Sequence, residues 1–151
     1  MIRRSLATLA LSAALALPAM AGDMIHKMSP HSVSVTMDRL AAAVEGAGAT
    51  VFARVDHAGG AAKVDMELRP TELLIFGNPK LGTPAMLDGQ TAGRDLPLRV
   101  LAYADAEGAV HVVYHDPAGL AEAHGLPADA EYIKMMTGAL DKLTSKAVAA
   151  E

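Results

Sequence analysis

One stretch decides how the chain is expected to fold: Glu72-Leu73-Leu74-Ile75-Phe76-Gly77-Asn78-Pro79-Lys80. Its apolar core, residues 73–76, is too short for a helix and is bounded by turn residues, which predicts a buried central strand. The glycine that follows permits a positive φ, Asn78 precedes a proline and is pushed out of the helical region, and the proline lacks a backbone donor. The strand should therefore leave the sheet sharply, which places Asn78 and Lys80 at a sheet edge where a ligand can bind.

Helical and strand patterns on both sides of this strand indicate an α+β domain. Apolar residues recur at helical spacing in residues 33–47, after a Ser32 cap, and again in residues 128–148. A four-residue link between the last two apolar runs predicts an antiparallel hairpin. The predicted strands cover residues 23–29, 50–57, 73–76, 96–104 and 109–114, with short helical turns at 58–64, at 84–87 and after Asp116-Pro117. The predicted order is β-α-β4-α, with the helices on one face of a mostly antiparallel sheet.

The first residues predict a secretory signal peptide. Arg3 and Arg4 precede an apolar run at about residues 6–17, and the small residues Ala19 and Ala21 lie just before the expected cut, which follows Ala21. We therefore expect residues 1–21 to be removed and residues 22–151 to form a single domain in the periplasm or outside the cell. The apolar run is too short for a stable membrane anchor, and the chain has no cysteine for a lipid anchor or a disulfide.

The charge of the chain argues against nucleic acid and anionic lipid as partners. The formal net charge is −4, and removal of the two basic residues in the signal makes it −6. Phosphate backbones are bound by clusters of basic residues, and single strands also need aromatic side chains for stacking. With only two phenylalanines, three tyrosines and no tryptophan, this chain offers neither. We expect no nucleic-acid partner and no membrane span after cleavage.

His57 is the first candidate for chemistry, because it follows a predicted strand and has Asp56 beside it. Such a histidine can bind a metal or haem iron while a carboxylate or carbonyl orients its second ring nitrogen. Asp56 and His57 can instead simply cap the turn and hydrogen-bond the Asn78 loop. The functional hypothesis requires that the end of this strand and the exit at Gly77 open onto one hollow. That hollow would be lined by His57, Asn78 and the turn formed by Tyr114, His115 and Asp116.

Other histidines and methionines suggest further metal ligands. His111 and His115 share a strand face but are about 13 Å apart, so one ion cannot bind both, although either can join His57 if their strands are neighbours. Met24, His26 and Met28 also share a strand face, and thioether plus imidazole is a ligand set for copper(I). The competing interpretation is that these methionines pack against a neighbour or lie in a flexible N-terminus. Similarly, His111 can be a solvent-facing strand residue and His115 part of the Asp116-Pro117 turn.

Several blocks of the sequence resemble the bacterial and archaeal family called domain of unknown function 302. The resemblance implies a fold like that of the TATA-binding protein, with a helix packed on a curved antiparallel sheet, and often a homodimer. It implies no activity. The blocks occur in the order of the family and consist of residues 36–40, 51–57, 69–84, 95–101 and 114–117.

These observations leave three hypotheses of different classes. The favoured one is an exported binding or accessory protein of the cell envelope, whose ligand is a small molecule, a metal or a cofactor such as haem or copper. The second is a small periplasmic enzyme in which His57 acts with Asp56 or Asp116 in proton transfer. The third is a homodimeric interaction module. The sequence contains no serine nucleophile elbow and no glycine-rich phosphate loop after a strand.

Overall fold

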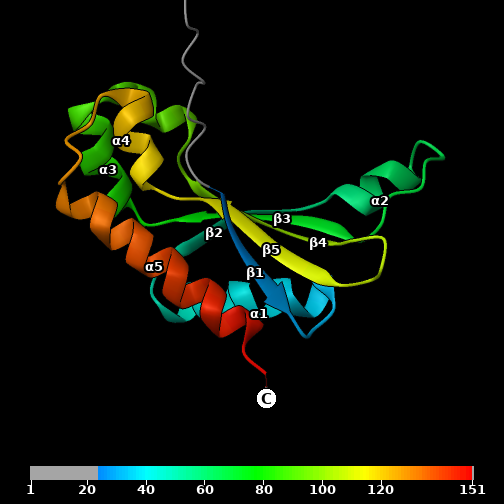
Figure 1. The fold of residues 1–151 in the computed structure, drawn as a ribbon. Helices are drawn as coiled ribbons and strands as arrows, with labels where there is room; N and C mark the ends of the chain where they lie inside the picture. The colour runs from blue at the N-terminus through cyan, green and yellow to red at the C-terminus, as the bar shows by residue number, and fades with distance from the viewer. Residues whose placement is uncertain (1–23, 151) are drawn as a thin grey trace, which may run out of the picture.

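The computed structural model describes residues 24–150, which form an α+β fold around a five-stranded antiparallel sheet (Figure 1). The strand order is β1-β5-β4-β3-β2. The predicted signal peptide lies outside the described residues. The strands are β1 (Met24–Ser29), β2 (Thr50–Asp56), β3 (Thr71–Gly77), β4 (Leu98–Ala104) and β5 (Val110–His115). The helices are α1 (Val33–Gly46), α2 (His57–Ala62), α3 (Pro79–Asp88), α4 (Ala118–His124), α5 (Glu131–Val148) and the short 3-10 helix η1 (Gln90–Arg94).

Helices α1 and α5 pack side by side against one face of the sheet (Figure 1). Helix α1 begins as predicted, because the Ser32 hydroxyl accepts a hydrogen bond from the Val35 amide at 3.3 Å. Side chains alternate between the two faces of each strand, so every second residue enters the core. Burial of these apolar side chains supplies the main driving force for folding. The core includes Met37, Leu40, Val44, Leu74, Phe76, Val100, Val112, Leu140 and Leu143.

The opposite face of the sheet is covered by no helix of the described residues (Figure 1), and we call it the open face. In β1, Lys27 lies on the helix-covered face, because its ammonium group reaches Asp141 and Ser145 on α5. Its neighbours in the strand, His26 and Met28, therefore point to the open face, away from the helices. By the same alternation and the strand register, the open face carries Met24, His26, Met28, Leu73, Ile75, Arg99, Leu101, Tyr103, His111, Val113 and His115.

The remaining helices lie at the two ends of the sheet. Helices α3, η1 and α4 pack with the start of α5 to form a second, smaller core at the end where β3 leaves and β4 enters, whereas α2 projects from the other end (Figure 1). The expected short turn at 84–87 is wrong: α3 already starts at Pro79 and includes Pro84. The reason is that Asn78 caps the helix, accepting a hydrogen bond from the Lys80 amide at 2.9 Å, and proline is favourable at the first helical position.

Candidate functional site

His57 and Asn78 do not meet. β2 and β3 are antiparallel, and their pairs run from Asp56 opposite Glu72 to Thr50 opposite Gly77. His57 follows one end of this ladder and Asn78 follows the other, so their backbones are separated by about 20 Å. The prediction that His57 and Asn78 line one common hollow is therefore wrong.

The surroundings of His57 agree with the turn-capping interpretation of this segment, but the expected hydrogen bond to the Asn78 loop is wrong because that loop lies at the other end of the β2–β3 ladder. The Asp56 carboxylate accepts a hydrogen bond from the Gly59 amide at 2.8 Å and caps α2. Both Asp56 and His57 are exposed. Strands β3 and β4 lie between β2 and β5, so His57 is about 14 Å from the β5 backbone. A single ion cannot be bound directly by His57 together with His111 or His115.

Asn78 instead borders an apolar hollow beside α3, which we call the α3 hollow. Its volume is about 310 Å³. The carboxamide oxygen of Asn78 is engaged in capping, and Lys80 is exposed and outside the lining. The lining consists of Phe52, Gly77, Asn78, Pro79, Leu81, Gly82, Thr83, Met86, Leu96, Pro97, Leu98 and Met136.

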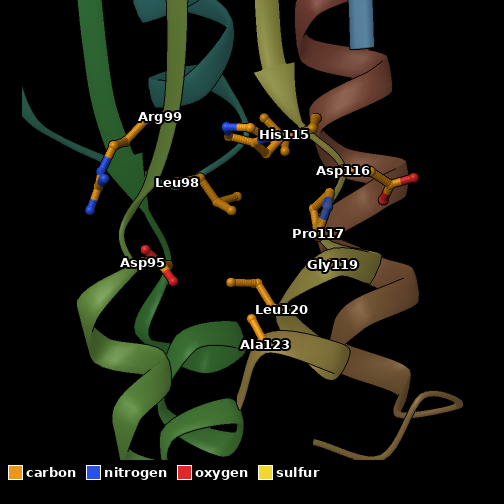
Figure 2. Close-up of a pocket in the computed structure, with 10 residues that line it drawn as sticks. Asp95, Leu98, Arg99, His115, Asp116, Pro117, Gly119, Leu120 and Ala123 are labelled. Atoms are coloured by element: carbon orange, nitrogen blue, oxygen red, sulfur yellow. The ribbon is translucent and has the colours of Figure 1, made fainter. Parts of the chain in front are cut away.

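A second hollow opens where β4 and β5 separate, and we call it the β4–β5 hollow (Figure 2). β4 pairs with β5 only from Leu101 opposite Val113 to Ala104 opposite Val110, whereas its earlier residues pair with β3 alone. The gap has a volume of about 260 Å³ and lies against α4 and α5. Its lining consists of Asp95, Leu98, Arg99, His115, Asp116, Pro117, Gly119, Leu120, Ala123 and Leu140. Leu98 also borders the α3 hollow, so the two hollows flank one side chain.

Two of the predicted site residues, His115 and Asp116, line the β4–β5 hollow. Tyr114 does not, because it alternates to the helix-covered face and is buried in the core with 6 % exposure. Asp116 points away from the hollow in Figure 2, and its carboxylate accepts hydrogen bonds from the Ala118 amide at 2.9 Å and the Thr137 hydroxyl at 3.2 Å. The Asp116 carboxylate therefore has a structural role in starting α4.

The polar groups that the sequence did not single out are Asp95 and Arg99. Asp95 Oδ2 lies 2.7 Å from His124 Nε2, which places an imidazole partner beside its negative charge. The Arg99 guanidinium donates one hydrogen bond to the Arg94 carbonyl at 2.9 Å. A guanidinium has five N–H donors, and within residues 24–150 this is the single hydrogen bond of the Arg99 side chain, so donors remain for a ligand.

Histidines and methionines gather on the open face along β1 and β5. Met28 is the cross-strand partner of His111, and Met24 is that of His115. The His111 ring stacks on Tyr103 with ring centroids 5.0 Å apart, and its Nε2 lies 2.8 Å from Asp105 Oδ2. This hydrogen bond is the main reason that the pKa of Asp105 falls below its ordinary value. Among the residues that the structure describes, no three histidine, aspartate or glutamate side chains are grouped to hold a metal ion.

The fold and the hollow define a two-layer α+β domain, with helices on one face of the sheet and a pocket at a strand separation. The chain belongs to the family described as Domain of unknown function DUF302, which matches residues 25–143. This confirms the resemblance seen in the sequence. The crystal structure of an uncharacterized conserved DUF302 protein from Bacillus stearothermophilus superimposes with a TM-score of 0.74 at 16 % identity. The match covers 82 % of this chain and 97 % of that one, so the two proteins share the whole fold.

Named relatives also occur in Brucella. The chain is 48 % identical over 112 residues to the fluoride-specific ion channel FluC 1 of Brucella suis biovar 1 (strain 1330). The same identity relates it to FluC 2 of Brucella melitensis biotype 1 (strain ATCC 23456 / CCUG 17765 / NCTC 10094 / 16M). These matches cover 73 % of this chain but only 44 % and 42 % of the relatives, so the chain spans less than half of their length. Along residues 24–150, the structure contains no helix with the length and apolar character needed to cross a membrane.

Proposed function

We propose that this protein is a binding protein for a small organic acid, which it holds in the β4–β5 hollow. The observation that carries the proposal is the gap itself, since β4 and β5 stop pairing beyond Leu101 and Val113 and separate, which leaves a recess of about 260 Å³. Ligand sites are typically concave and mainly apolar, with a few polar groups that orient the ligand. The β4–β5 hollow has this composition.

The lining suggests which chemistry the ligand has. Leu98, Leu120, Ala123 and Leu140 form an apolar wall that suits a hydrocarbon or aromatic body. Arg99 has N–H donors left for a carboxylate, and a guanidinium matches the geometry of a carboxylate. The two carboxylates of the lining already have partners: Asp95 has His124, and Asp116 has the start of α4.

We further propose that the protein acts in the cell envelope as a homodimer. The charged start, apolar run and small residues before Gly22 support export. Membership of the DUF302 family supports the dimer, because resemblance to this family implies that the protein is often a homodimer. The name of the Brucella channels does not enter the proposal, because this chain corresponds to less than half of those proteins.

Export and the dimer have direct tests. The mass of the protein recovered from the periplasm should match a chain that begins at Gly22, and light scattering should give twice that mass. A protein that keeps residues 1–21 in the cytoplasm contradicts export, and a monomer at high concentration contradicts the dimer.

Ligand binding is tested with a pair of probes that differ in charge, 2-naphthoate and 2-naphthylmethanol, followed by ligand-observed NMR. Both should bind, and the carboxylate more tightly. Arg99→Gln should weaken 2-naphthoate about tenfold, because a hydrogen bond between charged groups is lost, and should leave the neutral alcohol unchanged. Arg94→Gln is the matched control, since the Arg94 side chain is exposed and outside the hollow.

Filling the hollow tests its position. Ala123 is exposed on α4 and lines the hollow, so Ala123→Trp should place an indole in the recess and abolish binding of both probes without disturbing the core. Ala42→Trp, at an exposed position of α1, is the control and should bind normally. Equal binding by the Ala123 variant would overturn the proposed site.

A further inference from the structure

The open face of β1 and β5 holds a set of soft ligands that is separate from the β4–β5 hollow. Because the strands are antiparallel, Met28 faces His111 directly, and His26 lies one position further along the same face, opposite Val113. Cross-strand partners have Cβ atoms about 5 Å apart, and diagonal neighbours remain within reach of long side chains. One thioether and two imidazoles therefore occupy three neighbouring positions.

Val113 provides the floor beneath these side chains. It lies on the open face, which no helix of the described residues covers, yet it is only 7 % exposed. Its neighbours on that face come from β1, from β4 and from its own strand. Their side chains must lie over it to exclude water. The cluster is thus gathered over an apolar surface, while Met28 itself remains 56 % exposed and accessible to an ion.

His111 has the supporting contacts that metal-binding histidines commonly have. Its Nε2 pairs with Asp105 Oδ2 at 2.8 Å, and its ring stacks on Tyr103. In a neutral imidazole that donates from Nε2, the lone pair is on Nδ1. A carboxylate on the second nitrogen fixes the tautomer and ring orientation of a ligating histidine and increases its basicity.

We propose that Met28, His26 and His111 bind copper(I) on the open face, with Asp105 as a positioning residue. Thioether and imidazole ligands without a carboxylate select a soft ion, whereas magnesium and calcium prefer oxygen ligands. This proposal revises the copper hypothesis drawn from the sequence. Met24 and Met28 are four residues apart, about 13 Å along the strand, and β5 supplies the third ligand in place of Met24.

Copper(I) titration of the full, untagged protein tests the proposal, with ascorbate as reductant, exclusion of oxygen and a chromophoric chelator as competitor. One equivalent should bind. Met28→Leu and His111→Phe should each weaken binding at least about tenfold, and Asp105→Asn about tenfold through the orientation of His111. His111→Phe retains a ring to stack on Tyr103, and circular dichroism verifies that each variant is folded. Met66→Leu and His57→Ala, at exposed positions elsewhere, are the controls and should leave the affinity unchanged.

Silver(I), a redox-inert substitute for copper(I), gives an independent measurement. In protein labelled at the methionine methyl groups, the Met28 signal should shift with one equivalent of silver(I), and the Met66 signal should not. Absence of copper(I) binding, equal affinity in the Met28 and His111 variants, or a shift at Met24 without one at Met28 would overturn the proposal. Binding of 2-naphthoate in the β4–β5 hollow is measured separately, so failure of either proposal leaves the other standing.

Discussion

Arg54 on β2 and Glu72 on β3 form an ion pair on the helix-covered face of the sheet, and Asp38 of α1 contacts the same guanidinium. The hydrogen bond with Glu72 is the largest cause of the raised pKa of Arg54. Glu72→Gln removes the charge but keeps the shape, so it should lower the free energy of unfolding by about 1 kcal/mol. Urea denaturation measures this change. Glu45→Gln, at an exposed position of α1, should change it by less than about 0.5 kcal/mol; an equal effect in both variants would contradict the role of the ion pair.

A buried hydroxyl pair joins β1 to α1. Thr36 donates to the Ser32 carbonyl at 2.8 Å, so the Ser29 hydroxyl is the donor in the 2.7 Å contact between Ser29 and Thr36. Thr36→Val keeps the volume but leaves the Ser29 donor unpaired, which should cost about 1–3 kcal/mol. Replacing both residues, Ser29→Ala with Thr36→Val, should cost less than the sum of the single changes, as measured by a double-mutant cycle in urea. Strict additivity would show that the two hydroxyl groups are not coupled.

Tyr132 of α5 donates a hydrogen bond to Asp88 at the end of α3, at 2.8 Å. Burial is the main cause that raises the pKa of Tyr132 above its ordinary value, and the hydrogen bond adds to it. The folded chain holds this proton more tightly than the unfolded chain. The contribution of protonated Tyr132 to the free energy of unfolding is therefore fully present below about pH 10. It is lost as the pH rises through the higher pKa that Tyr132 has in the folded state.

The ultraviolet absorbance of tyrosinate tests the titration of Tyr132. The difference between the wild type and Tyr132→Phe should titrate above about pH 10. Asp88→Asn should lower that midpoint, because the nearby negative charge is removed. A midpoint at or below the ordinary tyrosine value would contradict the environment described for Tyr132.

Gly89 connects α3 to η1 at a point of close contact with α4. A Cβ atom at this position would lie 2.6 Å from Leu126 Cδ2 and 2.9 Å from the carbonyl oxygen of His124. Gly89→Ala should therefore lower the free energy of unfolding by about 1–3 kcal/mol through overpacking. Gly60→Ala, in α2, has open space around the added methyl group and should be neutral or slightly stabilising. Thermal unfolding compares the two variants; equal melting temperatures would show that the contact with α4 relaxes freely.

The order of strands and helices could be predicted because hydrophobic periodicity reports directly which residues face the core. The start of α3 was missed for a local reason. Gly77 and Pro79 predict a strand exit followed by a loop, whereas Asn78 before Pro79 is equally a helix cap followed by proline at the first helical position. The pairing of β2 with β3 is a long-range choice that no local pattern specifies, and this pairing separates His57 from Asn78.

The sequence carries a signal for the β4–β5 hollow. The predicted strands at 96–104 and 109–114 differ in length and are joined by a tight hairpin, so the first must extend beyond the second. In the structure β5 continues to His115, but Tyr114 and His115 pair only with β1, so the start of β4, including Arg99, has no partner on that side. Whether helices close or leave such a gap depends on the packing of α4 and α5, which the sequence does not specify.

The irregular register of β2 has a consequence for how the protein behaves at high concentration. β2 forms one edge of the sheet, and the register shifts between Val51 and Ala53, with Phe52 as the extra residue. A bulge disturbs the regular spacing of backbone donors and acceptors that another chain would need to extend the sheet. The bulge at Phe52 therefore makes this edge a poorer template for a further strand, even though it leaves an aromatic ring 56 % exposed.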